Sequence, residues 1–253
     1  MPRPIFVHFL PTLFEPDDVV GSIAVVVDIL RASTTITHAL ANGADCVIPC
    51  ATVEEAFAAR NELPTGTCLL GGERGGVRID GFDLSNSPTG YNPDTVRGKS
   101  IGFTTTNGTG ALIRAEKADD VLIGAFVNLS AVTDRLRTSE LPVHIVCAGT
   151  NGQITGEDVL FAGALVDKLG DGAAEEFETS DSTRIALDHW RDESGNGSTD
   201  ALQAALRRSQ GGRNLIELGY DRDIATAADT DSVPWIGRLT EGRTITASVR
   251  PDQ

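Results

Sequence analysis

The chain has 253 residues, of which 40% are hydrophobic and 23% are charged, and its formal net charge is −15. This acidic balance argues against nucleic acid and anionic membranes as partners, because proteins that bind them rely on clustered Lys and Arg. No apolar run approaches the ~20 residues that cross a bilayer, so a membrane-spanning protein is not expected either.

Residues 1–8 are the first expected strand. They contain a short apolar piece but lack the long apolar region and small-residue cleavage site of a secretory signal. We therefore expect a cytoplasmic protein whose cysteines are free thiols. The four cysteines are Cys46, Cys50, Cys68 and Cys147.

Apolar runs of strand length alternate with helical patterns over the first 170 residues. The expected strands are 22–27, 46–49, 68–70, 101–104, 121–124 and 144–147, and the expected helices include 33–42, 52–63 and those that follow Asn128 and Thr155. The almost continuous apolar run at 22–27 is typical of a strand buried on both faces of a parallel sheet. The alternation predicts a three-layer α/β/α sandwich with a mainly parallel, mixed sheet.

After residue 170 the sequence becomes rich in Gly, Asp, Glu and Ser, with short helices expected at 183–191 and 200–208. Residues 233–239 and 243–249 flank a turn at 240–242 and predict a C-terminal β-hairpin. We expect a single domain over residues 1–253, with 115–125 as the place where two lobes would divide.

The loop after the strand at 22–27 is the first candidate for chemistry, because ligands of open α/β sheets bind beyond the carboxyl ends of strands. It reads Asp28-Ile29-Leu30-Arg31-Ala32-Ser33-Thr34-Thr35. An acid that closes a buried strand, followed by an arginine and three hydroxyls, suits a metal ion together with an anion. The alternative is a helix cap with a local Asp28–Arg31 ion pair, and the sequence leaves both interpretations open.

A long loop at 71–88 is the second candidate. Its two Gly-Gly pairs bracket Glu73 and Arg74, so the backbone can approach a ligand while both charges are presented to it. Loops of this length are usually functional or disordered. Phe82 and Leu84 argue against disorder, and we expect a functional loop.

The segment Thr104-Thr105-Thr106-Asn107-Gly108-Thr109-Gly110 lies between an expected strand and an expected helix. Such a turn directs backbone N–H groups and hydroxyls toward one point at the positive end of the helix dipole, where a phosphate can bind. An ordinary strand-to-helix turn with a Thr or Asn cap is the alternative.

The loop Cys147-Ala148-Gly149-Thr150-Asn151-Gly152-Gln153 invites comparison with cysteine phosphatases. Those enzymes need Cys-x₅-Arg, and Gln at position 153 disfavours that mechanism, so Cys147 is expected to be a small buried residue. Glu157 and Asp158 follow in the first turn of the next helix. They either favour the helix dipole alone or hold Mg²⁺.

Taken in order, these motifs resemble the 2-phosphosulfolactate phosphatases. The resemblance rests on 26–35, 71–74, 81–88, 105–109, 147–150, 157–158, 211–215 and 233–234. It implies a three-layer α/β fold and Mg²⁺-dependent hydrolysis of (R)-2-phospho-3-sulfolactate to 3-sulfolactate and phosphate, a step towards coenzyme M. Close relatives can act on other small phosphomonoesters, so the physiological substrate stays open.

For such a reaction, the chemistry of individual residues suggests a role for each of them. The expected catalytic residues are Asp28, Arg31 and Arg74, where both arginines clamp anionic groups. The expected substrate-binding residues are Arg31, Arg74, Asn86, Thr105, Thr106, Asn107, Gly108 and Thr109. The candidate Mg²⁺ ligands are Asp28, Glu73, Glu157 and Asp158, of which one or two suffice. Asp28 acts either as a ligand or as the nucleophile.

The expected partner is a small anionic phosphomonoester, with no nucleic acid and no membrane, and a homodimer is a mild expectation. The alternative from another class is a non-catalytic, anion-binding or regulatory protein on the same fold. A dinucleotide-dependent oxidoreductase is disfavoured, because no Gly-x-Gly-x-x-Gly follows the first strand.

Overall fold

The computed structural model describes residues 3–170, 177–193, 198–240 and 243–248. Its strands are β1 (Arg3–His8), β2 (Ile23–Val27), β3 (Cys46–Pro49), β4 (Cys68–Arg74), β5 (Val77–Arg78), β6 (Ser100–Thr104), β7 (Asp120–Gly124), β8 (Val143–Cys147), β9 (Phe177–Thr179), β10 (Ile236–Thr240) and β11 (Thr244–Ser248). Within the described residues these strands form one sheet in the order β5-β4-β6-β3-β11-β10-β7-β2-β8-β1-β9.

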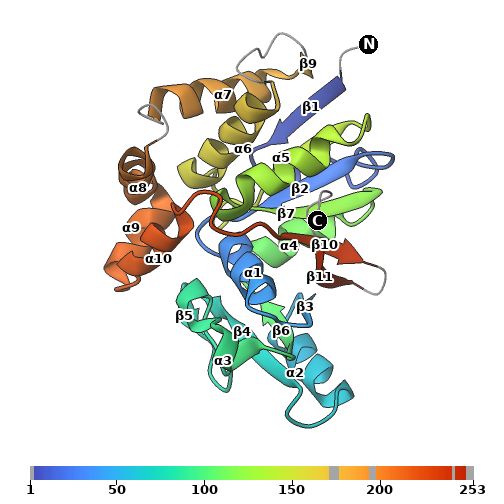
Figure 1. Cartoon of the computed structure of the whole chain (residues 1–253), viewed down its shortest axis with the longest axis vertical. Helices are drawn as coiled ribbons and strands as arrows, with labels where there is room; N and C mark the ends of the chain where they lie inside the picture. Colours follow the sequence, from blue (N-terminus) through green and yellow to red (C-terminus); the bar gives the residue numbers. More distant parts are fainter. Residues whose placement is uncertain (1–2, 171–176, 194–197, 241–242, 249–253) are drawn as a thin grey trace.

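The helices connect and cover these strands (Figure 1). They are α1 (Ala32–Ala41), α2 (Val53–Glu62), α3 (Pro93–Val96), α4 (Gly108–Ala115), α5 (Leu129–Arg137), α6 (Gly156–Leu169), α7 (Asp181–Glu193), α8 (Thr199–Arg208), α9 (Gln210–Glu217) and α10 (Asp221–Ala227). Short 3₁₀ turns span Pro11–Leu13, Pro88–Gly90 and Phe126–Asn128. None of the helices in the described part of the chain has the length and apolarity needed to span a bilayer.

Two clusters of buried apolar side chains lie on opposite faces of the sheet. Alternate residues of β2 separate into them, because side chains of a strand point to opposite faces: Ile23, Val25 and Val27 join one cluster, and Ala24 and Val26 join the other. Helices α5, α6 and α7 contribute to the first cluster, and α1 and α4 to the second. The predicted three-layer α/β/α sandwich is therefore confirmed.

The predicted C-terminal hairpin is also confirmed, and it lies in the middle of the sheet. β10 and β11 pair antiparallel with each other, β10 pairs antiparallel with β7, and β11 pairs antiparallel with β3. The hairpin thus joins a parallel half made of β3, β6 and β4 to a parallel half made of β7, β2, β8, β1 and β9. Its turn at 241–242 lies outside the described residues.

The two parallel halves run in opposite directions, because three successive antiparallel junctions separate β3 from β7. In a flat sheet their carboxyl ends would face opposite edges, whereas sheets twist by roughly 20–25° from one strand to the next. Figure 1 shows β1 and β2 in the upper part of the molecule and β4 and β6 in the lower part, with α1 between them. The division into two lobes near 115–125 stays a prediction.

The long loop expected at 71–88 is in part regular structure. β4 continues through Glu73 to Arg74, and Gly75 and Gly76, both at positive φ, turn the chain into β5. Glycine tolerates this left-handed backbone without the steric cost of a Cβ. The expectation of a loop was wrong for residues 71–74 and 77–78, because β4 gains a parallel partner in β6 that the local sequence does not reveal.

Helices α9 and α10 were not predicted. They follow α8, on the left of the molecule in Figure 1, and α10 contacts the Pro88–Gly90 turn. Their polar faces and the glycines at 211, 212 and 219 weaken the helical pattern. These two helices nevertheless supply one wall of the candidate site.

Candidate active site

A cavity of about 280 Å³ lies where β2, β4 and β6 end and α9 packs across them. It is lined by Asp28, Leu30, Arg31, Glu73, Gly75, Gly76, Asn86, Thr106, Asn107, Thr150, Asn151, Gly211, Asn214, Leu215, Glu217 and Leu218. Residues from four separate predicted loops therefore meet in one place with residues of α9. The carboxyl ends of the two oppositely directed halves of the sheet face each other across this cavity.

Asp28 follows the last residue of β2 and is only 8% exposed. Its Oδ1 accepts a hydrogen bond of 3.2 Å from the Ala32 N–H, and its own N–H donates to Ser33 Oγ at 2.9 Å. Burial, and then the neighbouring carboxylates of Glu73 and Glu157, raise the pKa of Asp28 to about 7. The carboxylate is thus fixed in position and its charge is poorly compensated.

Gly108 packs directly against Asp28. A Cβ at this position would lie 2.7 Å from Asp28 Oδ2 and 2.8 Å from the Ala32 Cβ, so a larger residue would displace the carboxylate. Gly108 is the first residue of α4, and its role is to let this helix approach the end of β2 closely.

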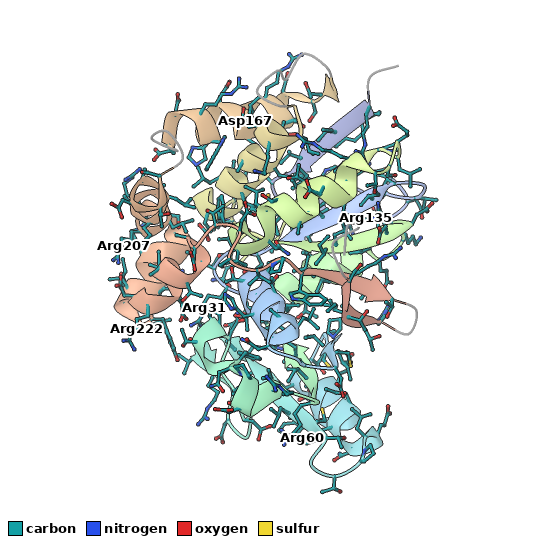
Figure 2. The ribbon with its side chains drawn as sticks, viewed as in Figure 1. Arg31, Arg60, Arg135, Asp167, Arg207 and Arg222 are labelled. Carbon is teal, nitrogen blue, oxygen red and sulfur yellow. The ribbon has the colours of Figure 1, made fainter. Side chains whose placement is uncertain are left out.

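Arg31 is buried at the junction of α1, the β4–β5 hairpin and α10 (Figure 2). Its Nη1 donates to Asp223 Oδ2 at 2.7 Å and its Nη2 to the Gly76 carbonyl at 2.8 Å. The Tyr220 ring lies 4.3 Å from the guanidinium carbon. Because a guanidinium has five N–H donors, these contacts fix Arg31 and leave donors for a ligand in the cavity.

Glu73 occupies part of the expected phosphate cradle. Its Oε1 accepts from the Thr106 N–H at 2.7 Å, and its Oε2 accepts from the Gly76 N–H at 2.6 Å and from Thr106 Oγ1 at 3.2 Å. The turn before α4 thus binds an anion as its sequence indicates, but in this structure the anion is a side chain of the protein.

Thr105 and Thr109 do not line the cavity. The Thr105 N–H donates to Thr109 Oγ1 at 3.2 Å, and the Thr109 N–H donates to Thr105 Oγ1 at 3.4 Å. Both side chains are buried and brace the first turn of α4. Of the hydroxyl-rich segment, Thr106 and Asn107 reach the cavity, and Asn107 Oδ1 accepts from the Asn151 N–H at 2.9 Å.

Arg74 does not join Arg31. It is exposed, lies outside the cavity lining, and donates to Thr104 Oγ1 at 2.9 Å. Successive residues of a strand point to opposite faces, so Glu73 and Arg74 at the end of β4 cannot both face the cavity. Asn86, in contrast, lines the cavity, and its buried Oδ1 has no hydrogen-bond partner within the described structure.

Glu157 and Asp158 lie behind the cavity wall, and each is 2% exposed. Asp158 is held by the N–H groups of Ile29 at 2.9 Å and Gly149 at 3.0 Å, so it ties two loops together. Glu157 packs behind Gly211, where a Cβ would lie 2.2 Å from Glu157 Oε1. Burial and nearby carboxylates raise the pKa of Asp158, and burial raises that of Glu157.

The site is therefore rich in hard oxygen donors with little positive charge to balance them. Among the residues that the structure describes, no group of three or more His, Cys, Asp or Glu side chains is placed to hold a metal ion. Glu157 Oε2 is nevertheless buried without a hydrogen-bond partner among the described residues, like Asn86 Oδ1. These features fit Mg²⁺, which binds one or two carboxylates and keeps several waters.

Cys147 is fully buried, and burial raises the pKa of its thiol well above the ordinary value. A buried protonated thiol is a poor nucleophile. The expectation that Cys147 is structural agrees with this environment.

Asp223 and Tyr220 are the main residues of the site that sequence reasoning missed. Asp223 is 1% exposed and accepts from Arg31 and, at 2.7 Å, from Ser87 Oγ. The one signal available was an acid next to Ile224 in a segment that could form a short helix, which is too common to single out a site.

The fold and the cavity define an α/β enzyme with an acid-rich site for a small molecule, and the comparisons with known proteins place it among the phosphoric monoester hydrolases. The family model for 2-phosphosulpholactate phosphatase matches residues 8–242. The chain belongs to the 2-phosphosulfolactate phosphatase family.

Curated relatives support this assignment along almost the whole chain. A probable 2-phosphosulfolactate phosphatase of Symbiobacterium thermophilum is 41% identical over 229 residues, which cover 90% of this chain and 96% of that protein. A protein of the same description from Caldanaerobacter subterraneus is 40% identical, with 86% and 88% covered. Another from Synechococcus sp. is 39% identical, with 93% and 96% covered.

Proposed function

We propose that the protein hydrolyses 2-phosphosulfolactate, or a similar small anionic phosphomonoester, to 3-sulfolactate and phosphate in an Mg²⁺-dependent reaction. The observation that supports this most is the meeting of Asp28, Arg31, Glu73 and Asn107 around one small cavity. A protein that only bound anions would need the arginine and the amide, but not a set of mutually repelling carboxylates.

The chain's own residues would bind and orient the substrate. Arg31, fixed by Asp223 and Gly76, would direct its remaining N–H donors to phosphoryl, carboxylate or sulfonate oxygens. The amide of Asn107 would bind a further oxygen from the opposite wall. Such positioning and charge neutralisation supply most of the catalysis in phosphoryl transfer.

Mg²⁺ would be held by Asp28 and Glu73, with Glu157 behind them, and when bound it would neutralise charge on the phosphoryl group. Asp158 is not part of this proposal, because it lies outside the cavity lining with both of its oxygens bound by backbone N–H groups. The oxygens of Glu73 also accept backbone N–H groups, but Glu73 lines the cavity. A test independent of turnover is the melting temperature. We expect millimolar Mg²⁺ to raise that of the wild type and to have little effect on Asp28→Asn.

The decisive experiment measures phosphate release from 2-phosphosulfolactate with Mg²⁺, and again after treatment with EDTA. We expect release only with the metal, and recovery when Mg²⁺ is added back. Hydrolysis in H₂¹⁸O then tests Asp28, because label in its carboxylate means a covalent aspartyl-phosphate. Label in phosphate alone is expected both from direct attack by water and from attack of water on the phosphorus of an aspartyl-phosphate. The stereochemical course at phosphorus separates these two cases, since the covalent intermediate gives net retention and direct attack gives inversion. If none of a panel of phosphomonoesters, 2-phosphosulfolactate included, released phosphate, the result would contradict the proposed function.

We further propose that the protein acts in the cytoplasm without a nucleic-acid partner. The four cysteines are free thiols, which suits a reducing compartment, and the net charge of −15 opposes binding to phosphate backbones.

A further inference from the structure

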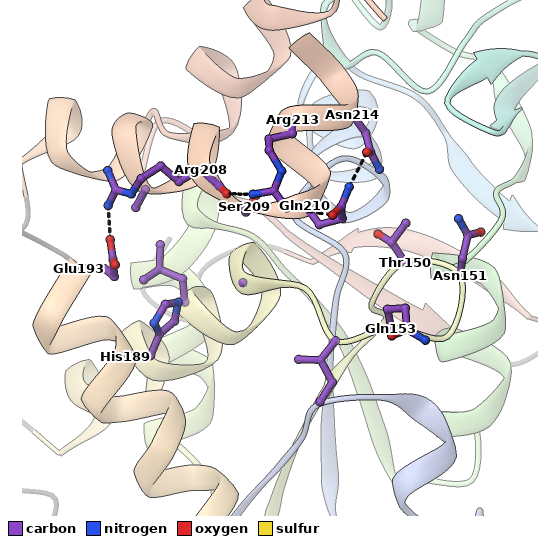
Figure 3. A pocket seen from close by; sticks show the side chains of 14 residues that line it. Thr150, Asn151, Gln153, His189, Glu193, Arg208, Ser209, Gln210, Arg213 and Asn214 are labelled. Carbon is purple, nitrogen blue, oxygen red and sulfur yellow. Dashed lines mark hydrogen bonds and ion pairs between the residues drawn. The ribbon is translucent and has the colours of Figure 1, made fainter. Parts of the chain in front are cut away.

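The cavity lined by Asp28, Arg31 and Glu73 is called the active cavity below. A second and larger cavity of about 710 Å³ adjoins it (Figure 3). Its walls come from the loop before α6, from α7 and from the junction of α8 with α9. Thr150, Asn151 and Asn214 line both cavities. Volumes of several hundred Å³ are typical of sites for organic ligands, whereas the active cavity is of a size that suits a small phosphomonoester.

The second cavity carries a local excess of positive charge in an acidic chain. Arg208 and Arg213 line it together with one carboxylate, Glu193, which pairs with Arg208. Arg213 forms no ion pair with a carboxylate in the part of the chain that the structure describes. It is held instead by the Arg208 carbonyl and by Gln210 Oε1, the latter at 2.9 Å. Its charge is therefore available to an acidic ligand.

Hydrogen bonds connect this arginine to the active cavity. Arg213 donates to Gln210, whose Nε2 donates to Asn214 Oδ1 at 2.7 Å, and Asn214 lines both cavities. Figure 3 shows Gln210 on α9 hydrogen-bonded to both Arg213 and Asn214. On the other side, Asn151 bridges to Asn107 of the active cavity.

We propose that the second cavity is a subsite for a second acidic group, a carboxylate, sulfonate or phosphate, of a phosphomonoester longer than the active cavity alone can hold. The phosphate would bind in the active cavity and the distal acidic group would bind Arg213. This inference rests on the proposed phosphatase site, and it widens the substrate class to extended organic phosphates with an acidic far end.

The test compares two ligands by calorimetric titration of the full chain carrying Asp28→Asn, so that neither is turned over. 6-Phosphogluconate has a distal carboxylate, and glycerol 2-phosphate has none. We expect Arg213→Gln to weaken binding of 6-phosphogluconate about tenfold or more, as for loss of a charge-assisted hydrogen bond, and to change binding of glycerol 2-phosphate less than about twofold. Arg213→Lys, which keeps the charge and loses the fork, should be intermediate.

Arg222→Gln is the matched control, because it removes the same charge from an exposed position that lines neither cavity. The subsite would be overturned if Arg213→Gln bound 6-phosphogluconate as tightly as its parent, or if it weakened the binding of both ligands equally. It would also be overturned if Arg222→Gln weakened 6-phosphogluconate binding as much as Arg213→Gln, or if neither ligand bound. Phosphate release from 2-phosphosulfolactate by the wild type judges the proposed function separately.

Discussion

At the scale of single residues, Asp28 combines burial with neighbouring carboxylates, so its ionised form is unfavourable in the absence of a cation. Its pKa is raised from 3.8 to about 7. The folded state therefore loses stability as pH rises from about 4 to about 7, and this stability is not regained above pH 7. Such a residue is expected to serve function at the expense of stability.

We therefore predict opposite effects of Asp28→Asn on activity and stability. Turnover should fall by orders of magnitude, because the amide neither attacks phosphorus nor holds Mg²⁺ well. In metal-free buffer at pH 8 the free energy of unfolding should rise by up to about 4 kcal/mol, since a buried charge is removed. Urea denaturation and phosphate release measure the two effects. Near-wild-type turnover would remove Asp28 from the mechanism.

The Arg31–Asp223 pair is a second property of single residues, with both side chains 2% exposed. Asp223→Asn should destabilise the protein by about 3 kcal/mol and lower kcat/KM at least tenfold, because Arg31 is left with an uncompensated buried charge and is less firmly held. The control is Asp221→Asn, which breaks a half-exposed pair with Arg207 and should cost at most about 1 kcal/mol without loss of activity. Equal effects of the two variants would contradict the positioning role.

At the scale of elements, the first turn of α4 determines where Asp28 lies. Gly108 and Gly110 belong to the same helix, but a Cβ would clash with Asp28 Oδ2 at the first and would meet nothing within 4 Å at the second. Identical substitutions at these positions separate helix propensity from the geometry of the site.

Gly108→Ala should lower kcat at least tenfold and destabilise the protein, because Asp28 and α4 must move apart. Gly110→Ala should leave kcat unchanged and raise the free energy of unfolding by up to about 1 kcal/mol, as expected when alanine replaces glycine within a helix. Steady-state kinetics and urea denaturation of both variants check this. Loss of activity in Gly110→Ala would show that any added side chain in this turn of α4 is harmful. It would contradict the explanation that Gly108 is needed because it lies against Asp28.

At the scale of the whole molecule, β1 and β8 bring two histidines together outside the lining of the active cavity. His8 Nε2 and His144 Nδ1 are 2.9 Å apart, and burial, followed by the charge of His144, lowers the pKa of His8 to about 4. Because the unfolded chain takes up this proton near pH 6.5 and the folded chain does not, stability falls as pH drops from about 6.5 to about 4.

His8→Gln should remove this part of the pH dependence, on the order of 2 kcal/mol between pH 7.5 and pH 4.5. Buried acids with raised pKa values make stability change with pH in the opposite direction. The test is therefore the difference in the free energy of unfolding between the variant and the wild type, measured by urea denaturation at each pH. A difference that does not vary with pH would refute the assigned cause.

A homodimer also stays a prediction at this scale, and sedimentation equilibrium tests it.

Much of the site could be predicted because its signals are local. Asp28 at the end of an apolar strand, Glu73 between glycines and the hydroxyls before α4 can each be recognised within a few residues. Asp223 could not, because its partner Arg31 lies 192 positions away and neither residue's neighbours indicate the other. The position of Arg74 outside the cavity lining could not be predicted for a similar reason, since the extent of β4 depends on pairing with β6.

The sequence by itself determined the alternation of strands and helices, the three-layer sandwich and the loops that carry the chemistry, because hydrophobic periodicity and turn residues act over short distances. Only the tertiary structure decided that the hairpin of β10 and β11 separates two oppositely directed halves of the sheet, and that Glu73 rather than a ligand binds the Thr106 N–H. Those outcomes depend on which groups come within hydrogen-bonding reach, and that is fixed by the packing of segments remote in the chain.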